Sequence, residues 1–509
     1  MKESEEIVDL IKSLSKTEKR YFKVFISRTS IGESSHYLKL FDLIEKAGTA
    51  EKRVIQELHE DKDFIKKQFN VYKGRLFNQI LKSLSAYHSE KSVDDKILEL
   101  IRQAIILFNK ILYPSAEKVL ERAQILALKY EKYTLLLEII RWQKKIIIAS
   151  SIFKNTSEKD LIKFFEDESL TVKKIDNINE YRKQYTLFCL YHLTNGGARK
   201  QEDIEGYNRL IDLPMLQNEE LALSYHAKRD LYNTYGIYYA AIYNGAKSVS
   251  YYKKILLLME SLPHQIEEDP VKYVNIFYNL LCSVLSLKQY EELFEMIPKL
   301  KSMLRKFQFP VSIHLRTCHL ELSAYLYTGQ VNKGLTLLTE IEDHLKKEKN
   351  TNERSKLLLS MEIAMLYFTN RDYHNSLVNL NLALNKKNIG GEYYNFAKVF
   401  QLIVHFEKGN TELLPYISKS VYRHLMQKKQ LHKIESVFIQ FIRTRIHTIR
   451  TVKDQVEAFK ALREELVKIS DDLMEARFLE FFDIISWLES KIENRPFDEI
   501  LREKSGFEI

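Results

Sequence analysis

Apolar residues recur at spacings of three and four along nearly the whole chain, a pattern typical of amphipathic helices. The first such segment carries Ile7, Leu10, Ile11 and Leu14 on one face. Ser15 and Glu18 then have the spacing of a capping box, so a second helix is expected to begin at Ser15. The same periodicity continues to residue 84, and a polar stretch follows at 88–95. The pattern predicts an N-terminal helical bundle over 1–90.

The segment 95–228 continues the helical pattern without a regular repeat. Leu107 precedes a turn at Tyr113 and Pro114, where a helix is free to start because proline tolerates the first helical turn. One apolar face follows this turn, made of Ala116, Leu120, Ala123 and Ala127. We interpret 95–228 as divergent helical repeats.

A repeat with a recognisable period occupies 229–425. Its clearest unit has small Ala364, aromatic Tyr367, small Ser376 and Ala383 around a turn at 370–373. These residues resemble the packing positions of the tetratricopeptide repeat, in which small side chains let two helices approach closely. Four other segments align with this unit and place turns at 243, 288, 329, 371 and 409. The steps of 45, 41, 42 and 38 residues exceed the family's usual 34 or so, so the units are tetratricopeptide-like.

The resemblance implies an all-α fold, an α-solenoid of tetratricopeptide-like helix pairs with an N-terminal helical bundle and C-terminal capping helices. The segment 426–509 should supply the cap as three helices, at Leu431–Ile449, Lys453–Ile469 and Asp472–Ile492. The stretches LIKSLSKTEKRYFK and ISWLESKIENRPFDEILREK also resemble uncharacterised bacterial proteins of this size and layout, which implies no activity.

Composition supports long helices with short connections. The chain has 509 residues with only 14 glycines and 8 prolines, and 45% of its residues are apolar. The most apolar stretch, 133–153, is interrupted by Glu138, Arg141 and Lys144, which predicts a buried helix and no membrane span. The first residues read as a helix and not as a signal peptide. The three widely separated cysteines, Cys189, Cys282 and Cys318, suit a reducing compartment, so we expect a cytoplasmic protein.

Motifs for catalysis are weak. Gly329 and Gly334 have phosphate-loop spacing, but Leu335 stands where the loop needs lysine, and both glycines fit repeat packing. His314 and Cys318 share a helical face, while His319 projects away, so at most two ligands converge where zinc needs three or four. We therefore expect no catalytic residues, no cofactor, no metal site and no enzymatic activity.

The leading hypothesis is a protein–protein interaction scaffold that binds a peptide or a partner helix in a concave groove. Its oligomeric state and the identity of its partner are left open by the sequence. The positions implied by the family resemblance are mainly aromatic or amide-bearing, which suits peptide recognition. They are Asn233, Asn275, Tyr278, Arg316, His319, Tyr327, Met365 and Phe368.

The alternative is a peptide-sensing regulator that contacts nucleic acid. The net charge is +9, and the segment 411–453 has nine basic residues against two acidic ones. Its candidate phosphate contacts form a basic surface of Lys433, Arg443, Arg445 and Arg450. A helix-turn-helix in the N-terminal bundle, with Lys16, Lys19, Arg20 and Lys23, is a further possibility, although it lacks the usual glycine-containing turn. A solvated polar face on a capping helix is the simpler explanation of the basic surface.

Overall fold

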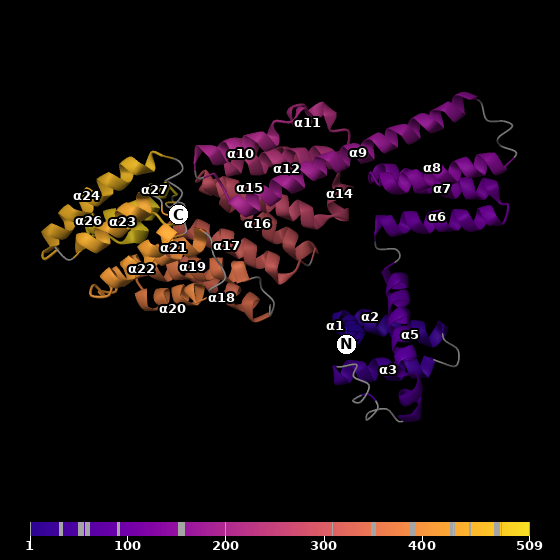
Figure 1. Cartoon of the computed structure of the whole chain (residues 1–509), viewed down its shortest axis with the longest axis horizontal. Coiled ribbons are helices and arrows are strands. Elements are labelled where there is room, and N and C mark those ends of the chain that lie inside the picture. Colours follow the sequence, from indigo (N-terminus) through magenta and orange to yellow (C-terminus); the bar gives the residue numbers. More distant parts are fainter. Residues whose placement is uncertain are drawn as a thin grey trace. The chain divides into compact units, whose positions relative to one another are not determined.

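The computed structural model describes most of the chain as helix (Figure 1). The described residues are 2–29, 34–48, 55, 62–88, 92–150, 158–198, 200–307, 309–347, 353–385, 392–427, 431, 433–446, 449–472, 479 and 481–507. All regular structure within these ranges is helical, which confirms the predicted all-α class. None of the helices described there has the length and apolar content to cross a bilayer.

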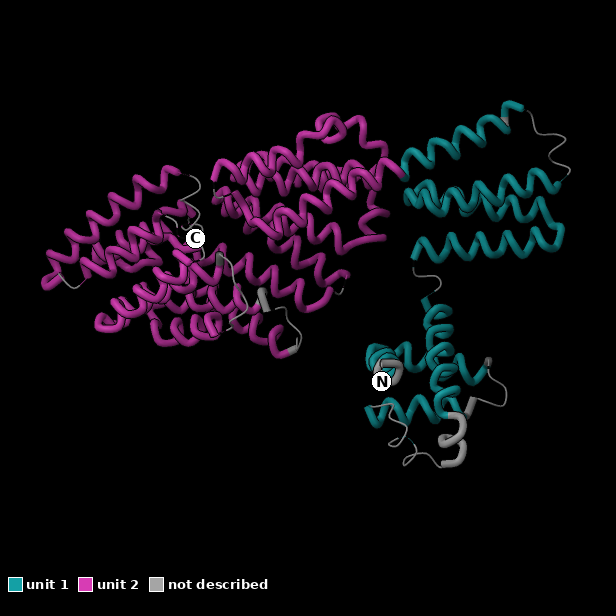
Figure 2. Tube along the Cα trace, viewed as in Figure 1, with its two compact units in different colours: residues 1–175 teal, residues 176–509 magenta. Residues whose placement is uncertain are grey.

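The contacts divide the chain into two compact units, 1–175 and 176–509 (Figure 2). The division falls inside one long helix, α9 (Glu158–Asn195). This boundary falls inside the segment 95–228 expected from the sequence, and the four-part division stays a prediction.

Among the described residues, the first unit begins with four clustered helices and continues with three packed ones. The helices described before α9 are α1 (Lys2–Ser13), α2 (Lys16–Thr29), α3 (Ser34–Ala47), α5 (Lys62–His88), α6 (Val93–Asn109), α7 (Tyr113–Lys129) and α8 (Tyr133–Ala149). The predicted capping box is confirmed, because the Glu18 N–H donates to Ser15 Oγ at 3.3 Å and the Glu18 carboxylate accepts from the Ser15 N–H at 2.7 Å. In α7, the face of Ala116, Leu120, Ala123 and Ala127 is buried as expected.

The second unit is a row of helix pairs. Its early helices are α10 (Gln201–Ile211), α11 (Pro214–Gln217), the 3-10 turn η2 (Glu219–Leu221) and α14 (Pro263–Glu268), with the pairs α12 (Tyr225–Ala241) and α13 (Gly245–Glu260), α15 (Pro270–Ser286) and α16 (Tyr290–Phe307). The pairs continue with α17 (Val311–Tyr327) and α18 (Val331–Lys347), α19 (Glu353–Thr369) and α20 (Tyr373–Leu384), α21 (Glu392–Glu407) and α22 (Leu414–Gln427). From α15 onward, the first helix of each pair also contacts the first helix of the next pair. This stacking confirms the predicted α-solenoid of helix pairs.

A left-handed residue ends the first helix of every pair. The residues with positive φ are Tyr243 (60°), Lys288 (57°), Gly329 (64°), Arg371 (61°) and Gly409 (77°), which are the five turn positions expected from the sequence. After each one, the next N–H returns to a helix carbonyl, as in the 2.8 Å bonds from Asn244 to Tyr239 and from Asp372 to Tyr367. This is the Schellman geometry, which satisfies the last carbonyls of a helix. Asn244 and Asp372 then cap the following helix, so each connection is only a few residues long.

Small residues hold the two helices of a pair close together. Ser376 donates a hydrogen bond to the Ala364 carbonyl at 2.7 Å, and Ser248 makes the same contact with Gly236 at 2.9 Å in the first pair. A Cβ atom on Gly236 would lie 2.8 Å from the Tyr252 ring, closer than real Cβ contacts. The small side chains predicted from the repeat therefore have a packing function.

The C-terminal helices differ from the expectation in their bounds and in the helix pairs that they contact. Within the described residues they include α23 (Lys433–Thr444), α24 (Val452–Ser470), α26 (Ile484–Glu493) and α27 (Phe497–Ser505), so α26 begins inside the third expected helix and α27 follows it. Trp487 is 1% exposed and packs among Phe406, Phe438 and Phe459. A terminal cap needs only to cover the last pair, yet α27 contacts α17, two pairs earlier.

Candidate functional site

A row of polar side chains crosses the first helices of three consecutive pairs. It consists of Asn275 and Tyr278 on α15, Arg316 and His319 on α17, and Glu362 on α19, and we call it the polar row. Asn233, Tyr278 and His319 each stand ten residues before the left-handed turn residue of their own helix. The shared register explains why equivalent positions line up when the pairs stack.

Arg316 joins two helices at the centre of the row. Its Nη1 donates to Asn275 Oδ1 at 2.9 Å, and its guanidinium carbon lies 4.2 Å from the centre of the Tyr278 ring. A cation over a ring face is stabilised by about 1 kcal/mol, and by more where water is excluded. Burial raises the pKa of Tyr278 well above its ordinary value, so the phenol is neutral. Arg316 therefore fixes the positions of one amide and one phenol on α15.

His319 and Glu362 form an ion pair between α17 and α19. His319 Nδ1 contacts one oxygen of the Glu362 carboxylate, and the Ser323 hydroxyl donates to the other. Burial alone would lower the pKa of His319, but the Glu362 carboxylate outweighs it and raises that pKa. The His319 side chain keeps 24% of its surface exposed, whereas that of Glu362 keeps 6%. A ligand could thus reach the imidazole while the carboxylate holds it from behind.

A buried polar group occupies the equivalent register position on α12. Asn233 is 7% exposed, and its Oδ1 has no hydrogen-bond partner among the described residues. One turn earlier, Arg229 lies 2.6 Å from Asp230, and both side chains are buried. A buried acceptor without a donor costs about 1 to 3 kcal/mol, so Asn233 is a point where an added N–H would be favourable.

The remaining groove candidates are placed differently. Tyr327 and Met365 are half-buried, nearer the turn ends of α17 and α19. Phe368 is 3% exposed and packs against Phe400, Phe482 and Phe497. The structure therefore removes Phe368 from the candidate surface, because the C-terminal helices cover it. The sequence could not show this, since the covering residues lie more than 100 positions away.

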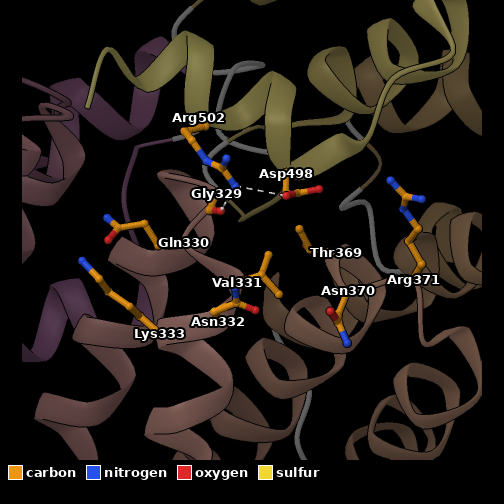
Figure 3. Close-up of a pocket in the computed structure, with 10 residues that line it drawn as sticks. All are labelled: Gly329, Gln330, Val331, Asn332, Lys333, Thr369, Asn370, Arg371, Asp498 and Arg502. Carbon is orange, nitrogen blue, oxygen red and sulfur yellow. Dashed lines mark hydrogen bonds and ion pairs between the residues drawn. The ribbon is translucent and has the colours of Figure 1, made fainter. Parts of the chain in front are cut away.

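A pocket of about 520 Å³ lies where α27 covers the turns of two helix pairs (Figure 3). It is lined by Gly329, Gln330, Val331, Asn332, Lys333, Thr369, Asn370, Arg371, Asp498 and Arg502. Arg502 is held by the Gly329 carbonyl at 3.3 Å and by Asp498 at 3.2 Å. Lys333 and Arg371 lie on opposite sides of the close-up, so the cations do not converge on one point. The pocket therefore lacks the arrangement that would hold a phosphate.

The glycines with phosphate-loop spacing both have packing functions. Gly329 is the left-handed turn residue, and a Cβ there would lie 2.3 Å from the Asp498 carbonyl oxygen. A Cβ on Gly334 would lie 2.7 Å from Leu366. Their spacing is thus explained by the helix pair.

The basic surface is exposed but spread along the chain. Lys433 stands at the start of α23 and Arg443 near its end, while Arg445 and Arg450 follow the helix. The guanidinium of Arg443 lies 5.4 Å from the centre of the Tyr422 ring. The helix expected over 431–449 thus ends at Thr444, five residues early, and the four side chains do not share one helical face.

A second polar cluster lies between α17 and α18, and the sequence reasoning missed half of it. Cys318 of α17 faces Glu340 and His344 of α18, with the three possible ligand atoms within 4.8 Å of one another. Among the neighbours of Cys318 along the chain, only His314 shares its helical face, so the sequence of α17 alone indicates two converging ligands. The missed signal was a second i, i+4 pair, Glu340 and His344, on the other helix of the same pair.

Comparisons with known proteins add little to this description of the fold and the candidate site. No family model matches the chain, and no curated protein matches it. Among solved structures, it is similar to a signal transduction ATPase with numerous domains from Pyrococcus horikoshii that has a tetratricopeptide repeat sensor. That likeness has a TM-score of 0.29 at 16% identity and covers 74% of this chain and 53% of the other. This chain thus spans about half the length of that protein, and the likeness is loose. The resemblance of the whole chain to bacterial proteins stays a prediction.

Proposed function

We propose that this protein is a non-enzymatic interaction scaffold that binds an extended segment of a protein partner along the polar row. The observation that supports it is the Arg316 cluster, in which one guanidinium holds an amide and a phenol on the neighbouring helix. Asparagine side chains offer both a donor and an acceptor, which matches the N–H and C=O of an extended main chain. The row mixes Arg316, His319 and Glu362, so its charges favour neither a strongly acidic nor a strongly basic segment.

The test uses the full chain and a display library of random peptides. Peptides selected on the wild type should bind the Arg316→Gln variant at least about tenfold more weakly, because Asn275 and Tyr278 lose their common support. Arg209→Gln is the matched control, since Arg209 is an exposed arginine on α10, a helix that contributes no residue to the row. Circular dichroism and thermal melting must show that both variants remain folded. Selected peptides that bind all three proteins equally would place the binding surface elsewhere.

Binding of nucleic acid remains the alternative hypothesis. Two of the four basic residues considered for a helix-turn-helix are already paired with α3, Lys19 with Glu45 at 2.8 Å and Lys23 with Asp42 at 2.7 Å. The basic surface around α23 keeps exposed arginines. If it contacts phosphates, binding should fall steeply with salt, and the paired change Arg443→Gln and Arg445→Gln should reduce that salt dependence. An absence of binding to DNA and RNA at low salt would remove this alternative.

A further inference from the structure

Two pairs of possible metal ligands face each other across the helix pair α17 and α18. His314 and Cys318 are four residues apart on α17, and Glu340 and His344 are four residues apart on α18. Residues at i and i+4 lie on one face of a helix, so the packing of the pair brings two such faces together. The His314 and His344 rings are stacked, with centroids 5.2 Å apart.

From this geometry we propose that Cys318, Glu340 and His344, with His314 as the fourth ligand, bind a divalent transition metal ion, with zinc the best fit. Thiolate and imidazole ligands with one carboxylate suit zinc, and the alkaline-earth ions prefer sites made of oxygen alone. Zinc ligand atoms lie on the order of 3.5 Å apart when the ion is tetrahedral. The three atoms within 4.8 Å of one another therefore need only small side-chain rotations to enclose it.

The surroundings of the cluster support this assignment. His344 Nδ1 is buried and has no hydrogen-bond partner among the described residues, so an ion bound at this nitrogen would satisfy it. Glu340 uses Oε2 to accept from Lys301 Nζ at 3.2 Å, while its Oε1 lies 3.7 Å from Nε2, the other nitrogen of the His344 ring. Lys301 thus holds the carboxylate in place and leaves its second oxygen for the ion.

The thiol sets the main energetic barrier to metal binding. Cys318 is 1% exposed, and burial, aided by the Glu340 carboxylate, raises its pKa to about 12. The ion must therefore displace the thiol proton, which leaves to solvent as the metal–sulfur bond forms. Burial also lowers the pKa of His314, with His344 adding to the effect.

The test is a titration of the reduced, metal-free full chain with Co²⁺ and then with Zn²⁺. One equivalent of Co²⁺ should give a thiolate charge-transfer band together with the visible bands of a tetrahedral ion, and Zn²⁺ should displace it. Zinc should also raise the melting temperature, because it binds the folded state and joins two helices.

Variants separate this site from other metal binding. Cys318→Ser should lose the charge-transfer band, and Glu340→Gln, at an exposed position, should weaken zinc binding at least about tenfold. Cys282→Ser is the matched control, because Cys282 occupies α15 and should leave the band unchanged. The proposal is overturned if the wild type shows no thiolate band, if the band survives in Cys318→Ser, or if all variants bind zinc equally, which would mean an adventitious surface ion only.

Discussion

The turn between α6 and α7 and the turn between α17 and α18 have the same backbone conformation in two different environments. Ile111 has φ 61° and Gly329 has φ 64°, and after each one the next N–H returns to a helix carbonyl, at 3.0 Å and 2.8 Å. Ile111 is 72% exposed. Gly329 is buried under α27, with Arg502 on its carbonyl. The helix pair therefore requires the left-handed conformation, whereas the residue that adopts it is decided by what packs on the turn.

The largest effect that follows from this comparison is expected at the covered turn. Gly329→Ala places a Cβ 2.3 Å from the Asp498 carbonyl oxygen and adds a side chain in the left-handed region. Overpacking and the conformational penalty should together destabilise the second unit by about 3 kcal/mol. Hydrogen exchange should show the loss first in α27, which has to move away.

Gly409→Ala is the matched control for this prediction. Gly409 has φ 77°, but a Cβ there would meet nothing within 4 Å. Only the conformational penalty remains, so the loss should be about 1 kcal/mol. If the two alanine variants lose equal stability, the contact with α27 does not restrain the turn.

These turns also show what the sequence could and could not reveal. The positions 243, 288, 329, 371 and 409 were predictable because turn geometry and small packing residues are local signals. The covering of Phe368 and Gly329 was not, since it depends on α27, far along the chain. The contacts of Glu362 and Glu340 with α17 were not predictable either. Each glutamate completes a cluster of side chains on α17, and the sequence pattern of one helix does not show how the neighbouring helix aligns with it.

Two contacts between helices, one in each unit, differ in charge, which leads to the second prediction. In the first unit, Gln143 of α8 donates to Gln124 of α7 at 2.8 Å, a neutral contact. In the second unit, the contact between His319 of α17 and Glu362 of α19 is ionic. Glu362→Gln should destabilise the second unit by about 2 kcal/mol near pH 6, because it leaves a charged imidazole without its partner.

The pH dependence of this loss has a defined sign. Glu362 raises the pKa of His319 in the folded state, against the opposing effects of burial and of Arg316. The ion pair therefore contributes fully below the unfolded pKa of about 6.5, and its contribution is lost as pH rises through the folded pKa. The difference in unfolding free energy between wild type and Glu362→Gln should shrink from about pH 6 to about pH 9. A difference that stays constant over this range would show that the pair is not ionic.

The smallest change in unfolding free energy is expected at Ile111, in the exposed turn between α6 and α7. Here the substitution should increase stability. Ile111 is β-branched in the left-handed region, where such residues are strained by about 1 to 2 kcal/mol. At 72% exposure it has little packing to lose. Ile111→Gly should therefore stabilise α6 and α7 by roughly 0.5 to 1 kcal/mol, after the extra unfolded-state entropy of glycine is deducted. Slower hydrogen exchange in these two helices is the measurement.

Lys110→Gly supplies the contrast, because Lys110 has φ −91° and gains nothing from a glycine. It should lose roughly 0.5 to 1 kcal/mol in the same assay. If both glycine variants destabilise α6 and α7, the left-handed conformation at Ile111 carries no strain. The two turns would then differ only in what covers them, and the penalty assigned to Gly409→Ala would have to be lowered as well.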